Sequence, residues 1–236
     1  MGKHEFKFIP VSKEAELNIP APRPAKAFYP KWMKEMPHTF VNKNNKESPY
    51  VNYCMPFTDS FITGYIQELP CDVEFTRETL PSGGSQINYR WANKFAPMTT
   101  RKEEDGSPNF FPKFPGYEHL DFQWQTFWEP KTPPGYSTFY MHPANQFDLP
   151  FLTMNGITDT DGWAIGGPIP FLLKEGWEGV IPAGTPIIQM LFIKREDWYS
   201  SKGVYDEKWD RNLQYQVRRV FKNGYKKLFW HKKVYL

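Results

Sequence analysis

The sequence predicts a mainly β protein, a β-sandwich or distorted barrel of the β-clip or jelly-roll kind, with an N-terminal proline-rich arm and a C-terminal helix. Three observations carry this prediction. The 23 prolines favour short strands joined by ordered turns, because proline interrupts helix interiors and central strands. Aromatic side chains make up 18% of the chain and supply much buried area per residue. Between residues 120 and 195, short apolar runs alternate with turn residues, which is typical of sandwiches and barrels.

One β-rich domain, 1–236, accounts for the whole length. Residues 1–50 are expected to form an extended arm, because the prolines at 20, 22, 24, 30 and 37 favour a polyproline-like path. Trp32, Met33 and Met36 would anchor that arm on the main body or on a neighbouring subunit. Residues 51–200 form the β core, and 205–236 the C-terminal helix and a basic tail.

Several segments have the β-branched and aromatic content of strands. They are 61–69, 72–76, 86–91, 122–128, 137–142, 149–153, 169–173, 179–181 and 187–194. The best-defined part is 176–196, where Pro182, Ala183 and Gly184 make a tight turn between two strands. Both faces of the second strand are apolar, so we expect a buried β-hairpin there, with Gln189 as its odd polar member.

The end of the chain has a helical pattern instead. Asp206 is a suitable N-cap, and apolar residues recur at helical spacing after it. We therefore expect one amphipathic helix over about 206–223, ended by Gly224 at the position after its C-cap.

Composition argues against secretion and membrane insertion. Cys54 and Cys71 form neither a disulfide framework nor a zinc pattern, so free thiols in a reducing compartment are expected. The start of the chain has no secretory signal, Phe6 breaks the myristoylation pattern, and no apolar run is long enough for a membrane span. We expect a cytosolic protein, and its net charge of +3 is too small to imply a partner.

A metal site is one candidate for chemistry. His119 and Asp121 form a His-x-Asp pair, and His142 follows in the same β region. Two histidines and one carboxylate are the ligands of non-haem iron oxygenases, so this set predicts iron or another divalent metal in a cupin-like enzyme. The alternative is that these histidines are structural and that there is no cofactor.

Hydrolytic chemistry has weaker support. No Gly-x-Ser-x-Gly elbow occurs, and neither cysteine has an activating sequence context. Asp159 and Asp161 lie in a turn near the segment 133–143 and could bind a cation or polar ligand, or could simply stabilise a pair of β-turns. The candidate ligand-binding residues of this region are His142, Asn145, Asp159, Asp161, Trp163 and Gln189. On balance we expect no catalytic activity.

The basic tail is the last candidate. Its cations include Arg218, Arg219, Lys222, Lys226 and Lys227, and aromatic residues lie between them. Such a pattern can hold phosphates and stack on bases, or it can form an assembly contact; nucleic acid is the less favoured reading.

The segment from Gly156 to Leu191 resembles the third and fourth motifs of the dUTPase and dCTP-deaminase β-clip superfamily. The matching residues are Gly156, Ile157, Asp159, Ile181, Gly184, Ile187, Gln189 and Leu191. His142 and Pro143 stand where the family has its phosphate-binding Arg-Ser pair. The resemblance therefore implies the fold and speaks against dUTP hydrolysis, leaving a degenerate nucleotide-binding protein as one alternative.

A longer pattern is similar to an uncharacterised domain family of bacteria and tailed phages. It comprises Tyr-Pro and Lys-Trp near 29–32, Cys-x-Pro-Phe at 54–57, Gly-Tyr-Ile-x-x-Leu-Pro-x-Asp-Val at 64–73, Pro-Pro-Gly-Tyr-Ser at 133–137 and Gly-Thr-Pro-Ile-x-Gln at 184–189. This resemblance implies a non-catalytic structural or binding protein of phage type. Its expected partners are further copies of itself or a phage or host protein, in the host cytoplasm or the virion.

Overall fold

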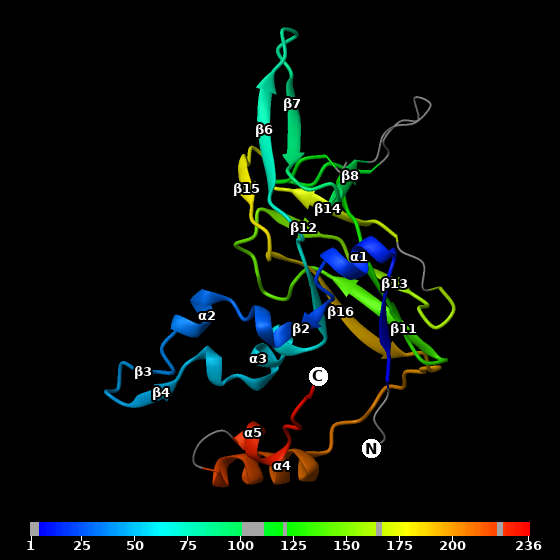
Figure 1. The fold of residues 1–236 in the computed structure, drawn as a ribbon. Coiled ribbons are helices and arrows are strands. Elements are labelled where there is room, and N and C mark those ends of the chain that lie inside the picture. The colour runs from blue at the N-terminus through cyan, green and yellow to red at the C-terminus, as the bar shows by residue number, and fades with distance from the viewer. Residues whose placement is uncertain (1–4, 101–110, 120–121, 164–166, 221–223) are drawn as a thin grey trace.

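A computed structural model describes residues 5–100, 111–119, 122–163, 167–220 and 224–236. Within them the chain is mainly β, with antiparallel sheets, a few short helices and a C-terminal helix, as the sequence predicts. The sheets drawn in Figure 1 are consistent with a β-sandwich, since three of them contribute side chains to one apolar core.

The largest sheet has the strand order β13-β11-β16-β5-β2. Its strands are β13 (Gly156–Thr158), β11 (Tyr136–Met141), β16 (Pro186–Lys194), β5 (Tyr65–Glu68) and β2 (Arg23–Pro24). The long strand β16 lies at the centre and pairs with β11 over the register Tyr136↔Lys194 to Met141↔Gln189. Its buried first half has apolar side chains on both faces, as expected for a strand covered on both sides.

A second sheet has the order β12-β14-β9-β8. Its strands are β12 (Phe151–Thr153), β14 (Ile169–Leu173), β9 (Phe122–Trp124) and β8 (Met98–Thr100). Trp124 of β9 is fully buried and stacks on Phe171 of β14, with ring centroids 3.8 Å apart. The indole N–H of Trp124 donates to Thr153 Oγ1 at 3.1 Å, and that hydroxyl donates to the Ile187 carbonyl of β16 at 2.6 Å. The polar groups of this interface are thus hydrogen-bonded across the two sheets.

The third sheet, β15-β6-β7, corrects one prediction. β6 (Val73–Thr79) and β7 (Ser85–Trp91) form a hairpin that rises from the body in Figure 1, and β15 (Gly179–Ile181) pairs with the base of β6. The predicted hairpin over 176–196 is therefore wrong: β15 and β16 are strands, but the turn between them carries the chain from one sheet to another. Adjacent strands need not pair when other strands offer a better apolar surface.

The N-terminal residues lie against the β body. β1 (Lys7–Pro10) pairs with β10 (Trp128–Lys131), and β2 is the edge strand of the largest sheet. Between them lies α1 (Lys13–Asn18), capped by the Ser12 hydroxyl, whose Ala15 packs with Ile19 and Phe127 in a small second core. The prolines set an irregular path, but the apolar residues between them bind the chain's own body. Of the two surfaces on which the N-terminal arm was expected to be anchored, the structure shows the chain's own body.

The remaining N-terminal elements are short. They are η1 (Ala25–Phe28), α2 (Lys31–Glu35), the strand pair β3 (Thr39–Val41) and β4 (Glu47–Pro49), η2 (Val51–Tyr53) and α3 (Met55–Ile62). In Figure 1, α2, β3 and β4 extend to one side of the body. The predicted strand 61–69 is wrong at its start, because the chain is helical to Ile62 and extended only from Tyr65.

Gly64 places β5 against β16. Its φ is +79°, and a Cβ built on it would lie 2.1 Å from the Met190 carbonyl oxygen. Only glycine combines this left-handed conformation with so close an approach of two backbones. The Gly64 carbonyl also accepts a hydrogen bond from Ala25 N at 3.0 Å, so three segments meet at this residue.

The C-terminal residues form two helices rather than one. Asp206 caps α4 (Glu207–Arg219) by accepting from Trp209 N at 2.9 Å, which confirms the predicted start. The predicted end is wrong: the C-cap is Val220, and Gly224 begins α5 (Gly224–Leu228) instead of ending α4. The two helices pack together below the β body in Figure 1. None of the helices in the described part of the chain is long and apolar enough to cross a bilayer.

Candidate functional site

The predicted ligand residues are tied into internal hydrogen bonds. His142 accepts from Thr153 N at Nδ1 (3.2 Å) and contacts the Gln146 carbonyl through Nε2 (3.1 Å). Nδ1 as acceptor and Nε2 as donor correspond to one neutral tautomer. Burial lowers the pKa of His142, which also favours the neutral ring.

Gln189 and Asn145 hold a neighbouring turn. The Gln189 amide accepts from Ala144 N at 2.8 Å and donates to the carbonyls of Ser60 and Thr63. Asn145, at a φ of +58°, donates to Ser60 Oγ at 2.7 Å. Gln189 of β16 thus joins the end of α3 to the 143–146 turn, and this role requires no ligand.

The predicted metal set can be judged only in part. Asp121 lies outside the described residues, and no group of three potential ligands occurs among the residues that are described. Both ring nitrogens of His142 have partners, while His119 has an interaction of its own. The metal set therefore stays a prediction.

Asp159 and Asp161 instead meet Arg195, which the sequence analysis did not select. We call Ser137, Asp159, Asp161 and Arg195 the Arg195 cluster. The Arg195 guanidinium is paired with the Asp161 carboxylate, lies 3.2 Å from Asp159 Oδ1 and donates to Ser137 Oγ at 3.0 Å. The hydrogen bond from Arg195 lowers the pKa of Asp161 to about 2, because it favours the ionised carboxylate.

The Arg195 cluster fixes the Pro-Pro-Gly-Tyr-Ser turn. Asp161 Oδ2 accepts from Gly135 N at 2.8 Å, and the Gly135 carbonyl accepts from Arg195 N at 2.8 Å. Underneath, the Thr160 hydroxyl lies 2.9 Å from that of Thr132 and 2.8 Å from that of Thr138, all three buried. The turn between β10 and β11 is therefore fastened to the end of β16. Trp163, predicted beside these aspartates, is mostly exposed.

A large aromatic groove opens next to this turn. Its volume is about 1060 Å³, and six of its lining residues are aromatic: Phe6, Phe8, Tyr65, Tyr136, Phe192 and Tyr235. Phe6, Phe8, Tyr65, Phe192 and Tyr235 form one cluster of ring contacts, in which the Phe6 and Phe192 centroids lie 3.9 Å apart. Arg23, Lys232 and Glu5 supply the charged lining, and Arg23 is paired with Glu68.

Sequence reasoning missed this groove because segments from both ends and the middle of the chain build it. Pro133 and Tyr136 of the fastened turn form one wall, while residues 232–236 form another. The tail is held in place because Tyr65 Oη donates to the Leu236 carbonyl at 3.0 Å, and Lys233 Nζ lies 2.6 Å from Asp59 Oδ2. The only available signal was the Pro-Pro-Gly-Tyr-Ser motif itself.

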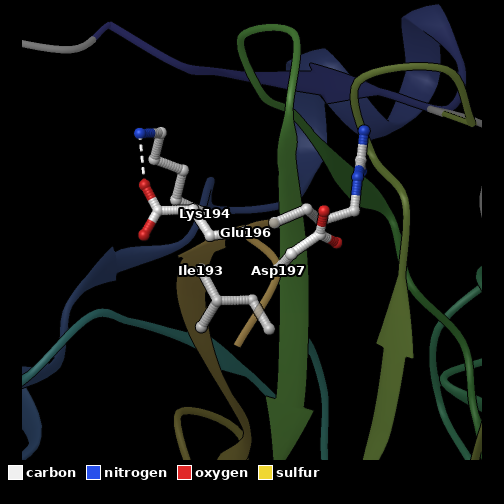
Figure 2. A pocket seen from close by; sticks show the side chains of 5 residues that line it. Ile193, Lys194, Glu196 and Asp197 are labelled. Atoms are coloured by element: carbon white, nitrogen blue, oxygen red, sulfur yellow. Dashed lines mark hydrogen bonds and ion pairs between the residues drawn. The ribbon is translucent and has the colours of Figure 1, made fainter. Parts of the chain in front are cut away.

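Beyond Arg195 the chain leaves the β body. A shallow depression is lined by residues 193–197, and Figure 2 shows Lys194 and Glu196 facing each other there, with Asp197 directed elsewhere. We call residues 197–205 the aromatic segment. Its large side chains are almost entirely exposed: Trp198 85%, Tyr199 94%, Val204 97% and Tyr205 79%.

Helix α4 continues this exposed surface. It has no buried residue, although Trp209, Leu213 and Val217 follow one another at helical spacing. The predicted basic residues are spread over this part of the chain: Arg218 and Arg219 end α4, Lys226 and Lys227 belong to α5, and Lys222 lies outside the described residues. Arg219 stacks on Tyr215 at 4.9 Å and Lys226 lies over Trp230 at 5.9 Å, so some of the rings between the cations already have cationic partners.

These features define a mainly β protein with an aromatic groove and a protruding, aromatic-rich C-terminal region. The chain matches no protein-family model and no curated protein sequence.

Proposed function

We propose that this chain is a non-catalytic structural protein that self-associates, and that the aromatic segment and the apolar face of α4 form the contact with a second copy. The exposure of the aromatic segment carries the proposal. Monomeric proteins rarely expose a contiguous apolar patch of more than a few hundred Å², and larger patches mark interaction sites.

The available area is enough for a stable contact. Large aromatic side chains bury about 150–250 Å² each. Trp198, Tyr199, Tyr205 and Trp209 are each more than half exposed, and Val204 is almost fully exposed. Together they offer on the order of 800 Å², which is the area that each partner contributes to an interface of standard size.

The internal bonding of the polar residues supports a non-catalytic role. Catalytic groups in a site usually point into a cleft with unsatisfied or reactive atoms. Here His142, Gln189 and Asp161 each bond to the chain's own backbone, and the groove is lined mainly by rings and prolines.

Light scattering coupled to size-exclusion chromatography tests the proposal. We expect the wild-type chain to have the mass of an oligomer at roughly 1–100 µM, where interfaces of ordinary affinity are populated. The double variant Trp198→Ser/Tyr205→Ser should have the mass of the monomer, with an unchanged far-ultraviolet circular dichroism spectrum. Phe147→Ser, which changes an exposed ring on another part of the surface, is the matched control and should leave the oligomer intact.

A wild-type mass equal to that of one chain would overturn the proposal. So would an oligomer that the double variant leaves unchanged, because the contact would then lie elsewhere.

A further inference from the structure

We propose that the aromatic groove of one copy receives the aromatic segment of another, so that two chains exchange residues 197–205. This inference rests on the proposed self-association and names its acceptor. The groove is apolar, open and formed by rings, and the chain carries a segment of matching chemistry that its own groove does not hold.

The position of the aromatic segment fits an exchange between chains. It begins just after Arg195, whose backbone N–H is bonded to the Gly135 carbonyl of the groove-wall turn. Phe192 lies in the groove and is only a few residues upstream. The segment thus leaves from the rim of one groove, and a two-fold partner placed against that rim would bring its own groove within reach. Reciprocal exchange of this kind closes a dimer without leaving an open binding surface.

The sizes agree. Ligand pockets have volumes of roughly 300–1,000 Å³. The groove, at about 1060 Å³, has room for several large side chains of an extended segment. Aromatic side chains inserted in such a pocket are the usual energetic centres of protein interfaces.

Charge does not oppose the exchange. The aromatic segment contains one acidic and one basic side chain, Asp197 and Lys202. The charged side chains that line the groove are Glu5, Arg23 and Lys232, and Arg23 is paired with Glu68. The contact therefore rests on the apolar and aromatic surfaces of the two parts.

Complementation between two defective variants tests the exchange. The segment variant Trp198→Ser/Tyr205→Ser keeps an intact groove. The groove variant Lys232→Glu/Val234→Asp keeps an intact segment, and both of its changes are at exposed positions, so the fold should survive. Each variant alone should have the mass of the monomer. An equimolar mixture should contain a species of about twice that mass, because one intact segment–groove pair then remains.

Cysteine cross-linking locates the contact. In a background of Cys54→Ser/Cys71→Ser, one chain carries Val204→Cys and the other Val234→Cys. We expect a covalent heterodimer on mild oxidation of the mixture, and much less product from chains that carry only one of the two cysteines.

The outcomes separate this inference from the proposed function. The wild type could be oligomeric while the groove variant also stays oligomeric, or while the two variants fail to complement each other. Self-association would then stand, but the groove would not be its acceptor. A monomeric wild type would overturn both.

Discussion

The carboxylate of Asp59, in α3, receives the indole N–H of Trp230 at 2.8 Å and the ammonium of Lys233 at 2.6 Å, across 171 and 174 residues of sequence. The carboxylate is nearly buried, and both contacts are made by its Oδ2; Oδ1 has no hydrogen-bond partner among the described residues. This contact fixes the point at which the chain returns from α5 to the β body.

Asp59→Ala should therefore release the C-terminal tail. Removing the acceptor leaves a partly buried indole N–H and an ammonium without this partner, which costs about 1–3 kcal/mol. Limited proteolysis should cut first between residues 220 and 236 in the variant, while Trp230→Phe should show a smaller effect because Lys233 keeps its partner. Equal cleavage rates for the wild type and Asp59→Ala would contradict this role.

Gly64→Ala should destabilise the whole β body. The added methyl would meet the Met190 carbonyl and the Leu191 side chain at 2.1 and 2.6 Å, at a φ that alanine rarely adopts. We expect a loss of about 3 kcal/mol or more in the free energy of unfolding, measured by urea denaturation. Gly116→Ala is the matched control: it has a similar positive φ but open space around it, so about 1 kcal/mol is expected. Equal losses would show that the contact with β16 is unimportant.

The Asp161–Arg195 pair predicts a change in acid stability. The pKa of Asp161 in the folded chain is lowered from 3.8 to about 2, so its contribution is present above pH 3.8 and is lost as the pH falls towards 2. Asp161→Asn lacks this contribution. The difference in melting temperature between the wild type and the variant should be largest near pH 5 and should shrink towards pH 2. A constant difference over that range would contradict the assignment.

Glu129 predicts a pH dependence of the opposite sign. Burial raises the pKa of this side chain, which also lies 3.4 Å from the Tyr140 hydroxyl. The folded chain holds the proton that the unfolded chain releases, so stability falls as the pH rises above the unfolded value of 4.5. Glu129→Gln removes that ionisation and should be more stable than the wild type at pH 7.5, with little difference at pH 4. Denaturant unfolding at the two pH values measures both quantities, and a variant less stable at pH 7.5 would rule this account out.

His142 bears on the metal prediction. With both ring nitrogens bonded inside the fold, we expect added Fe²⁺ or Zn²⁺ to leave the melting temperature of the protein unchanged. The control is His119→Ala, measured in the same titration. A stabilisation that is saturable with one metal per chain and that this variant abolishes would restore the metalloenzyme alternative.

Local sequence patterns predicted well which residues form strands, but they predicted poorly which strands pair with each other. Segments 169–173 and 179–181 match β14 and β15 to the residue, because short apolar runs there are bounded by turn residues. The pairing of 179–181 with β6 rather than β16 depends on contacts made about a hundred residues away, for which the sequence has no local signal. The aromatic residues around Phe61 were predicted to be part of a strand, but they belong to a helix. The Phe61 ring packs against Tyr29 and Trp32, with centroids 5.3 and 5.8 Å from its own, and such tertiary contacts leave no local signal in the sequence.

The candidate site was even less predictable. Asp159, Asp161, His142 and Gln189 were selected for their chemistry, which the fold uses for its own hydrogen bonds. The groove combines residues from 5–8, 22–24 and 232–236 with single side chains between them, so no window of sequence contains its pattern. The exposed aromatic segment could not be distinguished from a buried one, because composition does not show which rings find a partner in the same chain.

The central place of β16 has a consequence for how the chain is made. β5, at residues 65–68, has its main partner at 186–194, and the Tyr65 hydroxyl completes its bonding only with residue 236. At a synthesis rate of about 5–20 residues per second, β5 waits for roughly ten seconds on the ribosome before its partner emerges. During that interval the apolar faces of β5 are not covered by β16. Nascent chains stalled before residue 186 should therefore bind holding chaperones, whereas released chains should not.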